Sequence, residues 1–178
     1  PGRLRRDAKA QASTLERERS TTKKYPTRSG FIMKRQAYLD LQEKHRKELN
    51  EFPIAYAFND KQLQEALEKL GAESVDECVT VMGSGDIVKK ENGKPFLDLL
   101  KRQVKEVQEL LLSDIDIAEA AFLYEMDNHE YAINWSGDED VMSCFGIDEN
   151  FIREHGLQLA YESARRKHMK HAEEWEMI

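Results

Sequence analysis

The chain has 178 residues, of which 40% are hydrophobic and 34% charged, and its formal net charge is −7 at pH 7. That length suffices for one well-packed domain and is short for two. No apolar run approaches the roughly 18 residues that span a bilayer, and residues 1–32 lack the apolar core of a signal peptide. We therefore expect a cytoplasmic protein that does not associate with membranes.

The charge is divided sharply along the chain. Residues 1–32 hold nine Lys or Arg against three acids, a net of +6, so the 18 basic and 31 acidic residues of 33–178 sum to −13. The first segment has almost no large apolar residue, and we expect it to be unstructured or to lie outside the natural protein. We expect nucleic acid as a partner only through this basic arm, whose Lys and Arg could bind phosphates. The natural chain is expected to start at Met33.

The first half of residues 33–178 alternates between helical and extended patterns. Tyr38, Leu41, His45 and Leu49 form one stripe of an amphipathic helix over residues 33–50. Residues 52–58 then alternate large and small side chains, which predicts a central strand with a small face open to a helix. Asn59 and Gly71 cap the helix that follows. A hairpin is expected over residues 77–82 and 86–90, joined by a glycine-rich turn.

The second half is mainly helical. Asn92 and Gly93 suggest a turn, with Pro95 at the first position of a long core helix and a second helix capped near Ser113. Residues 130–136 alternate again and predict a strand. Short helices ending near Gly146 and Gly156 precede a long terminal helix, residues 157–175. This helix carries a narrow seam at steps of four and three residues: Leu157, Tyr161, Ala164, His168, His171 and Trp175.

The order of these elements predicts an α+β fold, with a small, mainly antiparallel sheet, several packed helices and a long C-terminal helix. Residues 33–178 form the single domain and residues 1–32 lie outside it. The strands are expected near 52–58, 77–82, 86–90 and 130–136. The terminal seam should pack on the domain or on a second copy of the chain. The sequence leaves the oligomeric state open between these two arrangements and slightly favours a dimer.

Few groups of residues suggest chemistry. Cys78 and Cys144 have neither CxxC nor Cys/His spacing and no histidine close in sequence, so we expect reduced, mostly buried thiols without a disulfide framework or structural zinc site. Ser84 lies outside a nucleophile motif. His168 and His171 lack a ligand partner at a firm spacing, which favours a solvated or seam-filling pair over a metal site. No cofactor is predicted. A divalent metal remains an alternative at a junction where four potential ligands lie close together: Glu125, Asp127, His129 and Glu130.

The most distinctive feature is acidic. Residues 106–152 contain 13 acids and no Lys or Arg. We interpret part of this stretch as an acidic surface for a basic protein partner, because concentrated negative charge steers association with basic molecules. The alternative is a solvated face, or internal pairing with Arg165, Arg166 and Lys167. The acids assigned to the partner-binding surface are Asp127, Glu130, Asp138, Glu139 and Asp140.

Three short motifs carry a resemblance to a known group of proteins: residues 51–62 around a strand and helix start, residues 83–85, and residues 128–131. Over roughly residues 33–155 the chain resembles a family of small uncharacterised proteins from phages and gut-bacterial mobile elements, a domain of unknown function. The resemblance implies no activity or site, and the terminal helix falls outside it. We interpret the chain as a non-enzymatic accessory protein of bacterial or phage origin, with a divalent-metal-dependent, phosphoesterase-like enzyme as the alternative.

Overall fold

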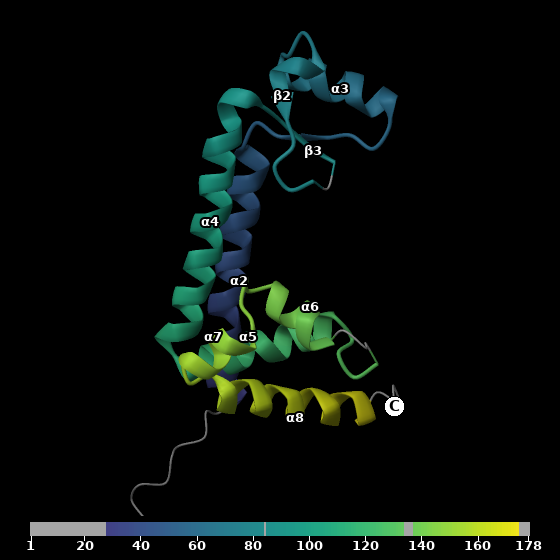
Figure 1. The fold of residues 1–178 in the computed structure, drawn as a ribbon. Helices are drawn as coiled ribbons and strands as arrows, with labels where there is room; N and C mark the ends of the chain where they lie inside the picture. Colours follow the sequence, from purple (N-terminus) through teal and green to yellow (C-terminus); the bar gives the residue numbers. More distant parts are fainter. Residues whose placement is uncertain (1–27, 84, 134–136, 175–178) are drawn as a thin grey trace, which may run out of the picture. The chain divides into compact units, whose positions relative to one another are not determined.

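The computed structural model describes residues 28–83, 85–133 and 137–174 (Figure 1). The chain divides into two units, residues 1–31 and 32–178, and every element after the first helix lies in the second unit. Within the described ranges, seven α-helices and a three-stranded antiparallel sheet confirm the predicted α+β class. In chain order the elements are α2 (Arg28–Glu51), β1 (Ala55–Tyr56), α3 (Asp60–Leu70), the 3₁₀ turn η1 (Val75–Glu77), β2 (Cys78–Val79), β3 (Asp86–Lys89), α4 (Lys90–Ser113), α5 (Ile115–Asn128), α6 (Gly137–Ser143), α7 (Glu149–Glu154) and α8 (Gln158–Glu174).

Of the basic arm proposed for residues 1–32, residues 1–27 lie outside the described residues. Helix α2 begins at Arg28, five residues before the helix start expected at Met33. No helix in the described ranges has the length and apolar character needed to cross a membrane.

Strand β3 is the centre of the sheet, whose order is β1-β3-β2. Its Ile87 packs with Ala55 and Ala66 on the face covered by α3, while Val88 packs with Ile54 and Phe96 on the face covered by α4. Successive side chains of a strand point to opposite faces, so a strand with apolar residues at both positions is buried on both sides. The prediction that residues 52–58 form the central strand was therefore wrong.

Strand β1 is a two-residue edge strand because its flanking backbone groups bond elsewhere. The N–H of Phe58 donates to Gln62 Oε1 at 2.8 Å, and Asn59 Oδ1 accepts from the N–H of Gln62 at 2.9 Å, so the chain has already turned into α3. The Phe58 side chain is 74% exposed, although the alternation had placed it on the bulky face. The small face is confirmed, because Ala55 contacts Ala66 of α3. Gly71 ends α3 in the left-handed conformation, as predicted.

Helix α4 follows β3 without the turn predicted at Asn92 and Gly93. It begins at Lys90 and contains Pro95 in its second turn. A Cβ atom at Gly93 would lie 3.1 Å from the Val79 side chain, so this glycine permits close packing against β2. The bend to α5 lies at Asp114, whose side chain caps α5 by accepting from the N–H of Asp116 at 2.8 Å. The predicted second helix is thereby confirmed, with Asp114 in place of Ser113 as its cap.

The strand predicted over residues 130–136 is wrong where the chain is described. Residues 130–133 form turns, and residues 134–136 lie outside the described ranges. Glu130 has φ of 49°, and the N–H of Tyr131 donates to the carbonyl oxygen of Met126 at 3.1 Å, which closes the end of α5. This is the hydrogen-bond pattern of a helix C-cap with a left-handed residue, and it is incompatible with extended backbone. The apparent alternation therefore reflects a turn in which Tyr131 alone is buried.

Helices α5 and α8 pack side by side along the helical part of the domain (Figure 1). Three aromatic rings pack where α5, α8 and the residues after α6 meet. The ring of Phe122 on α5 lies 5.1 Å from that of Tyr161 on α8 and 5.2 Å from that of Phe145, measured between ring centroids. The α8 seam is buried against the same domain from Leu157 to His168, which confirms packing on the domain. Trp175 lies outside the described residues.

Helices α2 and α4 also lie side by side (Figure 1), and charged side chains join them. Glu106 accepts from Lys44 Nζ at 2.7 Å and from Arg102 at 2.8 Å, and lies 2.9 Å from His45 Nε2. The hydrogen bonds from Lys44 and then from His45 lower the pKa of Glu106 from its ordinary 4.5 to about 2. Gln103 completes the contact by donating to the His45 carbonyl oxygen.

Glu106 should make stability depend on pH in the acid range. Because its pKa is lower in the folded chain, its contribution is complete above about pH 4.5 and is lost as pH falls toward 2. We expect Glu106→Gln to lower the free energy of unfolding by about 1–2 kcal/mol at pH 7. In urea denaturation at a series of pH values, the difference from wild type should shrink below pH 4.5. Glu109→Gln, at an exposed ion pair with Lys105, is the control and should change little. If Glu106→Gln lowers the free energy of unfolding by the same amount at every pH in this range, the ionised Glu106 carboxylate is not the source of the stability.

Candidate functional site

Three side chains with metal-binding donor atoms converge beside the end of α5. Glu125 and His129 are one helical turn apart, and Cys144 follows α6. His129 Nε2 lies 3.2 Å from Cys144 Sγ and 3.5 Å from a carboxylate oxygen, Oε2, of Glu125. The three donor atoms all lie within 4.8 Å of one another. In the part of the chain that the structure describes, these three side chains form a group that could hold a metal ion.

Glu125 forms the floor of this group and is only 3% exposed. Its other carboxylate oxygen, Oε1, accepts from the Tyr38 hydroxyl at 2.7 Å and from Gln42 Nε2 at 2.9 Å, both on α2. Burial and the neighbouring Glu125 carboxylate raise the pKa of Tyr38 far above its ordinary value, so the hydroxyl remains a donor. In the described part of the chain, no lysine or arginine forms an ion pair with Glu125. The buried carboxylate is thus oriented by neutral donors.

The same three residue types also occur in cysteine hydrolase triads, but the geometry differs. In a triad the histidine contacts the nucleophile through one ring nitrogen and the acid through the other. Here His129 Nε2 is the atom close to both Cys144 Sγ and Glu125 Oε2. Burial, followed by the charge of Glu125, raises the pKa of Cys144 to about 11, whereas nucleophilic cysteines have a lowered pKa. The arrangement therefore does not match a cysteine hydrolase triad.

The sequence had grouped Glu125 and His129 with two further ligands, Asp127 and Glu130, which the structure places elsewhere. Asp127 Oδ1 lies 2.7 Å from His168 Nδ1 on α8, and Glu130 is exposed beyond the end of α5. Cys144 takes part instead, although the sequence had shown no histidine near either cysteine. The expectation of mostly buried thiols was wrong, because Cys78 is half-buried and Cys144 is exposed. The one-turn spacing of Glu125 and His129 was a signal available in the sequence. The approach of Cys144 depends on how α6 folds back on α5 and had no local signal.

His168 is fully buried, and both of its ring nitrogens have partners. The N–H of Ala132 donates to Nε2 at 3.1 Å, so the ring proton lies on Nδ1 and is donated to Asp127 at 2.7 Å. His171 Nδ1 is 3.5 Å from the same Asp127 oxygen. His168 therefore fastens the turn after α5 to α8, and its nitrogens are committed to protein partners. This agrees with the predicted seam-filling role.

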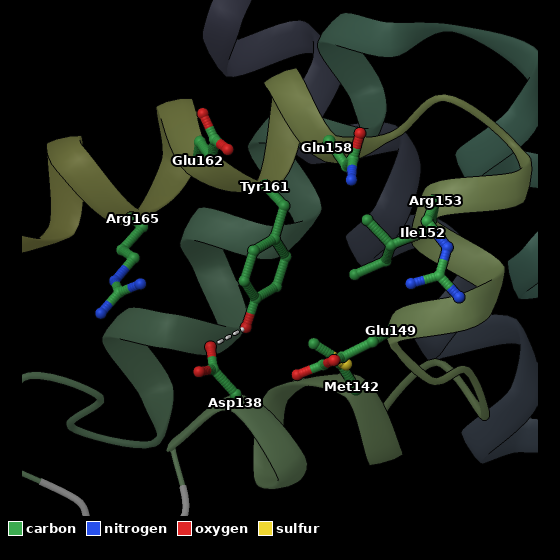
Figure 2. A pocket seen from close by; sticks show the side chains of 9 residues that line it. All are labelled: Asp138, Met142, Glu149, Ile152, Arg153, Gln158, Tyr161, Glu162 and Arg165. Carbon is green, nitrogen blue, oxygen red and sulfur yellow. Dashed lines mark hydrogen bonds between the residues drawn. The ribbon is translucent and has the colours of Figure 1, made fainter.

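Asp138, at the start of α6, also has a structural role. Its Oδ1 accepts from the hydroxyls of Tyr131 at 2.7 Å and Tyr161 at 2.6 Å. Figure 2 shows Asp138 and Tyr161 at the wall of a pocket of about 230 Å³ between α6, α7 and α8. Two arginines, Arg153 and Arg165, line this pocket together with the carboxylates of Asp138, Glu149 and Glu162. Positive and negative groups are therefore mixed there.

The remaining acids assigned to the partner-binding surface differ in their surroundings. Glu130 and Glu139 are exposed, and Asp140 is partly buried, its carbonyl oxygen accepting from Cys144 Sγ at 3.3 Å. By contrast, several acids earlier in the 106–152 stretch are paired with basic residues of α2, α4 and α8. These pairs are Glu106 with Lys44 and Arg102, Glu109 with Lys105, Asp114 with Lys34, and Glu119 with Lys167.

Comparison with known proteins gives one match. A model of a family of unknown function, DUF7659, matches residues 37–167. The chain belongs to the DUF7659 family. The match extends well into α8, so the expectation that the terminal helix lies outside the resemblance was wrong. No curated protein and no solved structure matches this DUF7659 chain. An origin in phages or mobile elements stays a prediction.

The role of His168 can be tested by a replacement that keeps a ring and removes both nitrogens. In the DUF7659 chain, His168→Phe should leave the N–H of Ala132 and the Asp127 carboxylate without this partner and lower the free energy of unfolding by about 2–3 kcal/mol. Urea denaturation measures the loss, and amide exchange at Ala132 should accelerate. His171→Phe, at a partly exposed position, is the control and should have a smaller effect. Equal effects of the two changes would contradict this role.

Proposed function

We propose that this DUF7659 chain acts without catalysis by binding a basic protein partner through exposed acids beyond the end of α5. The supporting observation is the contrast within the acidic stretch. Its earlier acids pair with lysines and arginines of α2, α4 and α8, whereas Glu130, Glu139 and Glu149 are exposed and form no ion pair with the described residues. Acids left without cations inside the chain are available to cations of another molecule.

This proposal narrows the surface assigned from the sequence. Of its five acids, Asp127 is engaged with His168 and Asp138 with two tyrosines. Glu130 and Glu139 remain as the exposed members, and we add Glu149 at the start of α7. We name these three the unpaired acids. Charges of this kind act mainly by steering the encounter and selecting partners, so their effect should weaken as salt rises.

The alternative, a phosphoesterase-like hydrolase using a divalent metal, has less support. Such enzymes hold hard cations with several convergent carboxylates. Glu125 hydrogen-bonds to α2, Asp127 to α8, and Glu130 is exposed, so these three carboxylates do not converge on one metal position. The arrangement therefore favours partner binding over that chemistry.

The test is capture of partners from a bacterial lysate by three forms of the chain, at low and high salt. The test variant is Glu130→Gln with Glu139→Gln. The matched control is Glu68→Gln with Glu73→Gln, which removes the same charge from exposed positions outside the stretch. A partner bound through the unpaired acids should be captured several-fold less by the test variant and less at high salt, but equally by wild type and control. Asp138 is kept because neutralising it would disturb Tyr131 and Tyr161.

Two results would contradict the proposal. One is capture that is indifferent both to salt and to the test variant, which would leave Glu130 and Glu139 as solvated acids with no part in partner binding. The other is an equal loss in the test and control variants, which would reflect net charge alone.

A further inference from the structure

Beyond partner binding, the donor atoms at the end of α5 support a second property of the chain. We propose that Glu125, His129 and Cys144 bind a single metal ion of the zinc class, with Tyr38 and Gln42 orienting the carboxylate. Three observations support this site: the spacing of the donor atoms, the unusual burial of Glu125, and the chemistry of the donor set.

The spacing matches coordination by one ion. Zinc bonds of about 2.0 Å to nitrogen or oxygen and about 2.3 Å to sulfur place neighbouring tetrahedral ligands roughly 3.3–3.6 Å apart. His129 Nε2 lies 3.2 Å from Cys144 Sγ and 3.5 Å from Glu125 Oε2. An ion bonded to Nε2 would therefore reach the other two donors with small side-chain movements. The contact of one nitrogen with both neighbours, which does not fit a triad, is expected around a shared ion.

The burial of Glu125 supplies a reason for a cation. A carboxylate this deeply buried is costly unless a positive charge or several hydrogen bonds compensate it. Oε1 has two donors on α2, Tyr38 and Gln42, at 2.7 and 2.9 Å. The contacts that are known for Oε2 are longer: Asn128 Nδ2 lies 3.4 Å away and His129 Nε2 3.5 Å away. The Cys144 thiol also hydrogen-bonds to the Glu125 carboxylate. No cation in the described residues other than His129 faces this carboxylate, and a metal ion held by Oε2, His129 and Cys144 would balance its charge.

The contacts of Oε1 resemble the outer contacts of known metal sites. Carboxylate ligands are usually held by hydrogen bonds that fix their orientation, and removal of such a partner lowers metal affinity by about 10–100-fold. Tyr38 and Gln42 hold Oε1 and thereby direct Oε2 toward His129. Gln42 also donates to the Tyr38 oxygen at 2.9 Å, so the two orienting groups are fixed relative to each other.

The donor set selects the class of metal. Thiolate and imidazole ligands favour zinc and similar transition metals, whereas magnesium and calcium prefer oxygen ligands. Cys144 is accessible to solvent and His129 is partly exposed, so an ion can enter from outside while Glu125 lies beneath. Three protein ligands leave a fourth tetrahedral position for water.

The test uses the full chain after treatment with a chelator. Co²⁺ should bind with a stoichiometry of one and produce the near-ultraviolet absorption of a thiolate–cobalt bond. Zn²⁺ should displace it, and Mg²⁺ at the same concentration should not.

Since Cys78 and Cys144 are the only cysteines, Cys144→Ser should abolish this absorption and Cys78→Ser should retain it. His129→Asn should weaken Zn²⁺ binding at least tenfold, and His155→Asn, an exposed histidine at the end of α7, should not. Tyr38→Phe should weaken it about 10–100-fold.

A second measurement on the unmodified chain does not depend on the folding of variants. Zn²⁺ should slow alkylation of Cys144 by iodoacetamide several-fold and leave the rate at Cys78 unchanged. The proposal is overturned by a folded protein that shows no thiolate–cobalt absorption, by absorption that survives Cys144→Ser, or by equal alkylation of Cys144 with and without Zn²⁺.

Discussion

Glu125 is a carboxylate buried within a helical core. Because burial of a charge is costly, its position depends on the groups that hydrogen-bond to it. Tyr38 and Gln42 bring α2 against α5, and the Tyr38 ring in turn lies 5.4 Å from Phe145, which follows α6. Tyr38 and Phe145 are both fully buried, so their positions and that of Glu125 depend on one another. Loss of a buried hydrogen-bonded partner leaves the remaining group desolvated without compensation. The carboxylate thus fixes the relative positions of three segments that are distant in sequence.

The turn after α5 connects this buried group to the rest of the domain. His129 begins the turn and faces Cys144, while Ala132 within it is bonded to His168 of α8. Tyr131, between them, donates to Asp138 at the start of α6. These three residues therefore contact the start of α6, the residue after its end, and α8. A donor set assembled at such a junction would be more rigid than one on an isolated loop, because its supports come from packed elements.

The sequence predicted helix ends correctly where residues at the end itself determine them. Asn59 and Gly71 bounded α3 correctly, because a capping side chain and a left-handed glycine act within a few residues. The strand pattern at residues 130–136 was misleading, since Glu130 adopts positive φ to close α5 and no side-chain alternation reveals this. The extent of β1 likewise depended on Gln62, which takes the Phe58 N–H away from the sheet.

The candidate site could be predicted only in part. Glu125 and His129 share one helical face by spacing alone, and both were among the ligands inferred from the sequence. Asp127 was grouped with them by proximity in sequence, yet it lies on a different side of α5 and faces His168. Cys144 joins the group because α6 reverses the chain, and the contact spans 15 residues that include the turn at 129–133. Tertiary packing therefore supplies the third donor.

The most direct measurement of the metal proposal is anomalous X-ray scattering at the zinc absorption edge from crystals grown with Zn²⁺. We predict one strong peak per chain, bonded to Glu125 Oε2, His129 Nε2 and Cys144 Sγ at about 2.0–2.3 Å. A peak at His168 and His171 instead, or none near His129 while Tyr38 still donates to Glu125, would contradict it.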